Sequence, residues 1–395
     1  MEENKVLGAQ TLKTFEKALK DNYLPVWKNL LGTEPSALLS RIKKVPLKSN
    51  KIVATAPMGL SGGFGFGAEG AATPASGNVV FERFETNAKD MYVNICISAK
   101  AVRLTGSGGA MANALDTEVK AAYETAKWNT GRALFGNGTG ILTELIGDTT
   151  DTTFEVSDVT YLKEGLIVDF IHKNDLTLLH SGKRIKSINR AAKTVTFEGA
   201  PINTNHAYLT VQNSYNREIT GLGAIFDNTI ETLYGVNKAA NPVLYPVVMD
   251  ANDAISDTII TRALREAKNI KNSNVDMFLC GDEAYDAYVT YLRENNIRVE
   301  DMSHTIQGGF KAIKFIFGNK EVDIVNESFV PSKEMWGVDT SALEFHTQEW
   351  NFADLQGGGI FNLMEGQSIY RALLANYGDL ICTNPGGCIR IHNCA

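Results

Sequence analysis

Glycine is concentrated in one stretch of the sequence, and this stretch constrains the fold more than any other feature. Residues 59–77 hold seven of the 35 glycines and read GLSGGFGFGAEGAATPASG. Strand candidates flank the stretch, with residues 51–57 before it and residues 78–86 and 89–98 after it. Because an isolated two-stranded excursion is not stable in water, we expect a partner to support this one laterally.

The first 50 residues differ from the rest of the chain in charge and in pattern. They carry nine Lys and Arg against five acidic residues, whereas the whole chain has a net charge of −7. Residues 9–48 form short amphipathic pieces separated by breaks, and such pieces cannot bury their apolar faces alone. The segment therefore predicts an arm that lies on its own body or on a neighbour, and its charge fits either a solvated helix or an arm facing nucleic acid.

The remaining patterns predict an α+β protein. Residues 109–135 are the best helix candidate, with Leu115, Val119, Ala122 and Ala126 on one stripe. Residues 153–213 contain five or six short strand candidates and no helix pattern, which indicates a small barrel. Beyond the barrel, a helix is expected at 253–270, with Asp253 as the N-cap, and a second helix at 282–296. Strands are expected at 275–281, 312–318 and 321–325.

Targeting signals are missing from the sequence. The first ten residues, MEENKVLGAQ, contain no apolar segment of a secretory signal, and no apolar run reaches the ~18 residues of a membrane span. Cys96 and Cys280 lie in apolar runs, so we expect both to be buried thiols. These features predict a protein made in a reducing cytosol, without a membrane partner.

Motifs of catalysis and cofactor binding are weak. Gly65–Gly70 matches GxGxxG, but the residues that follow, AATPASG, cannot open the helix that a dinucleotide site requires. The tail supplies four donors with unsuitable spacing for zinc, so they are only weak metal candidates: Cys382, Cys388, His392 and Cys394. The six histidines match no catalytic signature. We therefore expect no enzyme activity and no cofactor.

Several segments, taken in order, resemble a known family. FERFETNAKDMYVNICISAKAVRLT precedes the helix at 109–135, ALFGNGTGIL ends it, and REITGLGAIFD follows the predicted barrel. FLCGDEAYDAYVTYLR and FKAIKFIFGNKEVDIVNESFVPSKEMWGVD come later. This order of features is similar to that of the major capsid proteins of tailed bacteriophages, which have the Hong Kong 97-type fold.

The resemblance implies a division of the chain into the parts of that fold. The barrel is not in the minimal fold and is similar to the inserted domains of some phage capsids. The implied parts are the N-terminal arm (1–50), the extended β loop (51–98), the spine helix and peripheral domain (99–152), the inserted barrel (153–213), the mainly axial domain (214–360), and the return to the peripheral and axial domains with the C-terminal tail (361–395).

The same resemblance implies a structural function. The chain would assemble with itself into hexamers and pentamers of an icosahedral head, made in the bacterial host cytoplasm with a scaffolding protein and a portal. The head would enclose double-stranded DNA by non-specific contact. The candidate residues are Phe64, Phe66, Phe81 and Phe84 for contacts between subunits, and Lys13, Lys17, Lys20, Lys43 and Lys44 for the lumen side. No lysine lies between Lys51 and Lys89, so we expect no covalent crosslink at the loop tip.

Two other readings stay open. An encapsulin-like cellular compartment shares the fold and would hold an enzyme instead of DNA. A nucleic-acid-binding module is the second reading, because the predicted barrel has the strand count of an oligonucleotide-binding fold. Its basic cluster would be Lys183, Arg184, Lys186 and Arg190, and its stacking residues Phe170, Phe197 and Tyr208.

Overall fold

The computed structural model describes most of the chain beyond the first 35 residues. The described residues are 36–57, 59, 62–70, 75, 77–100, 109–147, 150–204, 206–295, 303–306, 309–353 and 362–394, with the side chains of 109–117 and 270–271 left aside. The chain divides into two compact units, of which unit 1 is Met1–Val119 with Ile225–Ala395 and unit 2 is Lys120–Ala224. Lys13, Lys17 and Lys20 lie outside the described residues.

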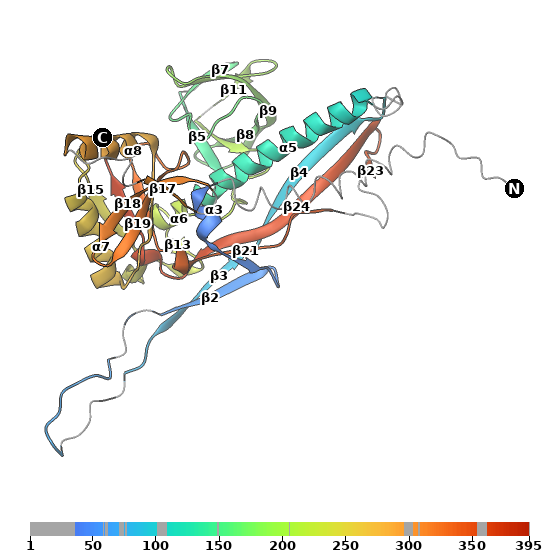
Figure 1. Ribbon diagram of the computed structural model, residues 1–395. Coiled ribbons are helices and arrows are strands. Elements are labelled where there is room, and N and C mark those ends of the chain that lie inside the picture. The colour runs from blue at the N-terminus through green and yellow to red at the C-terminus, as the bar shows by residue number, and fades with distance from the viewer. Residues whose placement is uncertain are drawn as a thin grey trace. The chain divides into compact units, whose positions relative to one another are not determined.

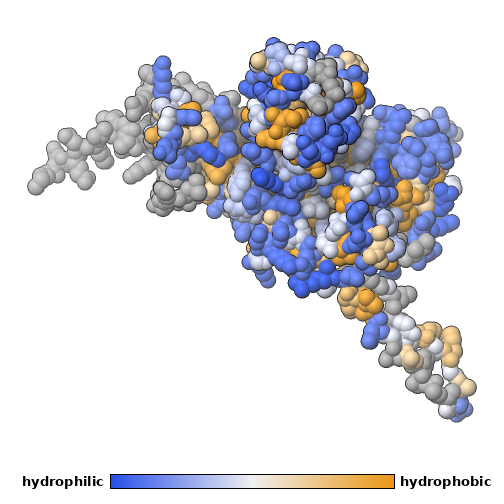
Figure 2. All heavy atoms as spheres, turned by 180° about the vertical axis from the view of Figure 1, so that it is seen from behind, coloured by the Kyte–Doolittle hydropathy of each residue, from blue (hydrophilic) through white to orange (hydrophobic). Residues whose placement is uncertain are grey.

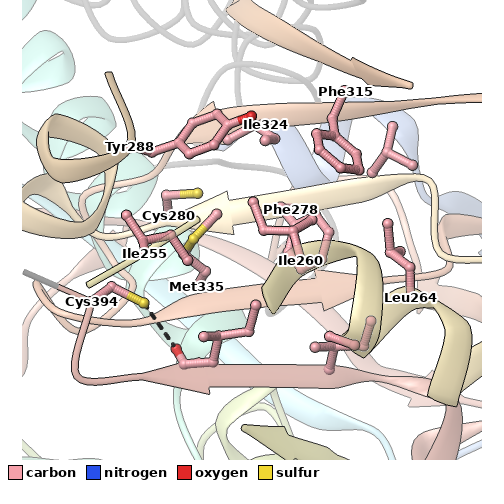
Figure 3. Close-up of a cluster of buried hydrophobic side chains, with 14 of the residues drawn as sticks. Ile255, Ile260, Leu264, Phe278, Cys280, Tyr288, Phe315, Ile324, Met335 and Cys394 are labelled. Carbon is pink, nitrogen blue, oxygen red and sulfur yellow. Dashed lines mark hydrogen bonds between the residues drawn. The ribbon is translucent and has the colours of Figure 1, made fainter. Parts of the chain in front are cut away.

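Unit 1 contains a seven-stranded sheet in the order β15-β25-β20-β16-β19-β18-β17. Its strands are β15 (Val247–Asp250), β16 (Met277–Cys280), β17 (Ser303–Thr305), β18 (Lys311–Phe317), β19 (Lys320–Asn326), β20 (Met335–Val338) and β25 (Ile389–His392). Figure 1 labels β15, β17, β18 and β19 of this sheet. Alternate strand residues such as Phe278 and Cys280 share one buried cluster with Leu264 of α7 (Asp257–Lys271) and Tyr288 of α8 (Asp282–Glu294) (Figure 3). Both helices therefore cover the same face of this sheet.

The start of α7 differs from the expected one. Asp253 has a left-handed φ of 57°, and the helix begins at Asp257 after Ser256 as the N-cap. The segment before Ser256 therefore turns instead of continuing the helix. The acidic residue that the helix dipole favours in the first turn is Asp257.

A second sheet in unit 1 is built on one long strand. The strand order is β1-β21-β24-β22, and β23 and β4 also pair with β24. The strands are β1 (Lys43–Pro46), β4 (Lys89–Ser98), β21 (Leu343–Thr347), β22 (Asn351–Phe352), β23 (Asn362–Leu363) and β24 (Ile369–Cys382). The whole of β4 pairs with β24, from Lys89 opposite Gly378 to Ser98 opposite Ile369. Residues 89–98 therefore belong to a sheet of their own chain, which corrects the expectation that the excursion 51–98 depends on a partner throughout.

The alternation of side chains along β4 also corrects the prediction that Cys96 is buried. Ile95 is buried, whereas its neighbour Cys96 points to the opposite face of the strand and is exposed. Successive strand residues face opposite sides, and an apolar run alone does not show that both sides are covered. Cys280 is buried, as expected.

Unit 2 consists of the second part of the long helix α5 (Gly109–Phe135) and a closed barrel. The strand order around the barrel is β10-β7-β5-β12-β8-β9, and the strands are β5 (Ile141–Ile146), β7 (Thr153–Val156), β8 (Ile167–His172), β9 (Leu178–Asn189), β10 (Thr194–Phe197) and β12 (Ala207–Val211). Phe154, Phe170 and Phe197 fill its core with ring centroids 5.0 to 6.1 Å apart. A buried aromatic cluster of this kind lets so small a barrel fold.

Two details of the barrel differ from the sequence reading. The barrel begins at β5, although the resemblance places residues 99–152 in the spine helix and peripheral domain. The sequence predicts two strands, at 176–180 and 183–189, whereas Leu178–Asn189 form one continuous strand β9, because Gly182 accommodates a φ of 70° without ending the pairing.

The helix α5 follows its predicted bounds. Val119, Tyr123 and Ala126 are buried, with the spacing of one helix face, and residues 130–135 are buried all round. Residues beyond this helix change direction at Gly138 and Gly140, whose φ values are 87° and 75°. The chain as described is a strand-rich α+β protein, as predicted.

Candidate assembly surfaces

The base of the hairpin formed by β2 (Lys51–Pro57) and β3 (Phe81–Asn87) is fixed on its own unit. Phe84 is fully buried, and its ring centroid lies 5.8 Å from that of Tyr234. Next to it, Glu85 N donates to Tyr234 O at 2.8 Å, and Thr86 Oγ1 donates to Asp379 Oδ2 at 2.5 Å. The base therefore has little freedom to move relative to β24.

Beyond this base the hairpin opens into an exposed apolar tip. Phe64 and Phe66 are 81% and 96% exposed, and their rings form an edge-to-face pair 5.2 Å apart. Phe81 and Val80, where the chain returns, are 63% and 62% exposed. Figure 2 shows apolar atoms along this projecting segment. Large aromatic side chains exposed together mark an interaction surface, so Phe64, Phe66 and Phe81 remain candidates for contacts between subunits.

Phe84 has to be removed from that set. The strand β3 alternates, and the side of the strand that carries Phe84 faces Tyr234 of the same chain. A side chain with 0% exposure in the single chain has no surface left for a neighbour. Of the two phenylalanines in FERFET, Phe81 is exposed and Phe84 therefore belongs to the core of its own chain.

We expect opposite results from two matched phenylalanine substitutions. Phe84→Ala should lower the free energy of unfolding by about 3–5 kcal/mol, because a large buried side chain is lost and a cavity remains. Phe66→Ala should change it by less than about 0.5 kcal/mol, because the ring is in solvent. Urea unfolding of both variants measures the difference, and equal effects would show that the tip is packed on its own chain.

The root of the N-terminal arm is built into unit 1. Ser36 caps α3 (Ala37–Arg41) by accepting from Leu39 N at 3.3 Å, and the first four residues of α3 are buried. Arg41 pairs with Asp323 on β19, and it lies 3.6 Å from Asp276. The chain then continues as β1, which pairs in parallel with β21.

The two described lysines proposed for the lumen side lie on β1. Lys43 Nζ is 2.5 Å from Glu344 Oε1 of its own chain, which already balances its charge. Lys44 is exposed on the next position. Both lysines stay candidates for a phosphate contact.

Glu327 is a buried carboxyl beside this root. It is 6% exposed, and the backbone N–H groups of Ala37 and Phe329 donate to it. Burial raises the pKa of Glu327 to about 8, against the lowering effect of these two hydrogen bonds, and the charge of Asp282 adds to the rise. At neutral pH the side chain is therefore mainly protonated.

This carboxyl predicts a pH dependence of stability. The folded chain keeps the proton of Glu327 up to a pH of about 8, whereas the unfolded chain releases it near the ordinary value of 4.5. The contribution of the protonated Glu327 to the free energy of unfolding is therefore complete below a pH of 4.5 and is lost as the pH rises through about 8. Glu327→Gln should reduce this loss, which urea unfolding at pH 5, 7 and 9 would measure. If the free energy of unfolding depended on pH in the same way for the wild type and for the variant across this range, the raised pKa of Glu327 would be contradicted.

A buried ion pair in unit 2 was not predicted. Arg132 on α5 makes a bidentate contact with Glu218, with Nη1–Oε2 and Nη2–Oε1 distances of 2.9 and 2.6 Å. Their side chains are 5% and 9% exposed. Beside the pair, Leu222 N donates to Leu134 O at 2.8 Å, and a Cβ on Gly221 would lie 2.4 Å from Leu134 O. Only the single Arg in the apolar helix end TGRALF hinted at this arrangement.

The four tail residues considered for metal do not come together. Cys382 and Cys388 hydrogen-bond each other, whereas Cys394 joins the core cluster around α7 and α8. His392 Nδ1 is 3.9 Å from Asp250 Oδ1. Within the described ranges no group of three or more His, Cys, Asp or Glu could hold a metal ion.

Most of the aromatic residues that the nucleic-acid-binding hypothesis requires for stacking on bases are buried in the structure. Phe170 and Phe197 are buried in the barrel core, with exposures of 0% and 2%. Tyr208 is partly buried, and the Lys173 ammonium lies 5.9 Å from its ring centroid. Two of the three rings therefore cannot stack on bases, which corrects this expectation.

As for membranes, none of the helices in the described residues is long and apolar enough to cross one.

Comparison with known proteins identifies the fold. No protein-family model and no curated protein matches the sequence. A chain of the cyanophage A-1(L) capsid asymmetric unit matches with a TM-score of 0.53 and 11% identity, over 92% of this chain and 93% of that chain. The SrpI encapsulin of Synechococcus elongatus matches with a TM-score of 0.48 and 9% identity, over 90% and 86%. The satellite phage P4 procapsid matches with a TM-score of 0.47 and 11% identity, over 98% of both chains.

The match to the cyanophage capsid chain covers nearly the whole of both chains. This protein therefore has the fold of a phage capsid protein, as the resemblance predicted.

Proposed function

We propose that this chain is the major capsid protein of a tailed bacteriophage and that it assembles with itself into a closed icosahedral shell. The observation that carries the proposal is the apolar tip of the β2–β3 hairpin on a capsid fold. Phe64, Phe66 and Phe81 are exposed in the single chain, on a hairpin whose base is rigid. A second copy that covers them would gain about 1.5–3 kcal/mol for each ring at full burial.

We assign the parts of the chain to a Hong Kong 97-type layout. Residues 1–50 are the arm, the hairpin with its tip is the extended loop, and α5 is the spine helix. The seven-stranded sheet with α7 and α8 is the axial domain, and the sheet around β24 belongs to the peripheral domain. The barrel, which starts at Ile141, is the inserted domain of this layout.

The partners follow from the same proposal. The subunits form hexamers and pentamers, and assembly in the host cytoplasm uses a scaffolding protein and a portal. The finished virion encloses double-stranded DNA. Lys44, and Lys13, Lys17 and Lys20 in the arm, would contact phosphates without sequence preference. The role of the chain is structural, and the proposal involves no cofactor.

Electron microscopy of the purified protein tests this function. Negative-stain images should show closed shells, with pentamers and hexamers in their walls, and particles from infected cells should contain DNA. Shells that are loaded with an enzyme would favour the compartment reading. Monodisperse single chains at every concentration, together with binding to nucleic acid, would favour the binding module and contradict the capsid proposal.

A further inference from the structure

The barrel carries a basic hairpin, which is defined here as β9, β10 and the turn between them. Residues 178–197 contain five Lys and Arg and no acidic residue: Lys183, Arg184, Lys186, Arg190 and Lys193. Arg184 and Lys186 flank buried Ile185 on β9, so their side chains leave the same outer face of the strand. Both are exposed, and in the described part of the chain neither forms an ion pair.

The partner of this hairpin has to be acidic, and the chain itself supplies such a surface. Residues 225–395 contain 23 acidic against 13 basic residues. A nucleic acid that approached one chain would therefore meet a repulsive body, whereas a second copy would be attracted. Of the three rings expected to stack on bases at the barrel, Phe170 and Phe197 are buried, which disfavours single-stranded nucleic acid as the partner.

One part of unit 1 fits the hairpin better than the others. Asp282 and Asp286 lie one turn apart on α8, both exposed and, among the described residues, without an ion-pair partner. Like charges at this spacing weakly destabilise a helix, and the helix dipole compensates only for Asp282 in the first turn. A cation from outside would remove the repulsion. Two acidic side chains about one helical turn apart can meet two basic ones spaced two residues apart on a strand.

We propose that the basic hairpin of one copy docks on the acidic face of α8, formed by Asp282 and Asp286, of a neighbouring copy. The inference rests on the proposed shell function and specifies one contact within it. The two surfaces differ, so the contact is heterologous, and a heterologous contact repeated around an axis closes a ring. It would orient the subunits during association and suppress wrong arrangements.

Two charge-reversed variants test the contact. In the first, Arg184→Glu and Lys186→Glu make the hairpin acidic, and in the second, Asp282→Lys and Asp286→Lys make α8 basic. Each variant alone should need about tenfold more protein than wild type for half-maximal assembly in sedimentation velocity, because like charges then face each other. Unfolding curves check that both variants fold.

Mixing the variants shows whether the contact joins two copies. In an equimolar mixture, the reversed hairpin of one variant faces the reversed α8 of the other, so rings in which the two variants alternate are relieved of repulsion. Formation of hexamers, which have an even number of subunits, should therefore return to within about twofold of wild type. The matched control, Arg265→Glu with Lys268→Glu on the exposed side of α7, changes the charge equally and should leave assembly unchanged.

Three results would overturn the inference. They are normal assembly of the hairpin variant, failure of the mixture to assemble, and an equal defect in the α7 control. Loss of binding to a duplex DNA fragment by a hairpin variant that assembles normally would reassign the hairpin to nucleic acid. If wild type itself forms no shells under any condition, the proposed function fails, and that result is distinct from these.

Discussion

Deletion of residues 59–77 should leave a folded subunit that forms no shells. The remaining residues between β2 and β3 are enough for a short hairpin turn, and the base contacts of Phe84 and Thr86 are untouched. The unfolding free energy should therefore stay within about 0.5 kcal/mol of wild type, since none of the removed side chains described by the structure is buried. Negative-stain microscopy at concentrations where wild type assembles should show no closed particles.

A milder variant serves as the control for this deletion. Phe64→Ala with Phe66→Ala keeps the length of the loop and removes only the aromatic pair, so assembly should weaken in proportion to the lost burial. Normal closed particles from the deletion would show that the tip has no part in assembly, whatever the control gives.

Arg132→Ala should lower the free energy of unfolding by about 3–5 kcal/mol. The substitution leaves the Glu218 carboxylate 9% exposed and without its bidentate partner, and a buried unpaired charge is costly. The pair also joins the last turn of α5 to the segment before α6 (Gly223–Phe226), so unit 2 should lose most of its stability. Urea unfolding followed by the fluorescence of Trp128, which packs on the barrel core, measures the effect.

Replacing both members of the pair separates charge burial from packing. Arg132→Met with Glu218→Leu removes both charges and keeps apolar volume, so the loss should be much smaller than in Arg132→Ala. If the double variant is as unstable as the single one, the cost comes from shape and not from the unpaired charge.

Sequence patterns predicted the elements whose signals are local. The bounds of β2, β4 and α5 agree with the predicted 51–57, 89–98 and 109–135. Alternation and helical periodicity are properties of neighbouring residues, and the chain turns after the helix at Gly138 and Gly140, which have positive φ values. The resemblance supplied the fold itself, because it rests on the order of the elements along the whole chain.

Features that depend on pairing between distant residues could not be predicted in this way. The assignment of β5 to the barrel depends on its ladders with β7 and β12, and the exposure of Cys96 depends on which side of β4 is covered. In the candidate surfaces, the exposed tip was predicted, but Phe84 was misplaced because Tyr234 lies 150 positions further along the chain. The partner of Arg132, Glu218, lies 86 positions along the chain, and Ala37, one of the two groups that hydrogen-bond Glu327, is also remote in sequence.

A cryo-electron microscopy reconstruction of the assembled particle tests the central claim most directly. The account predicts that Phe64 and Phe66 are buried against a neighbouring copy of the chain in every hexamer. A closed particle in which both rings point into solvent, or a protein that never forms particles at all, would contradict it.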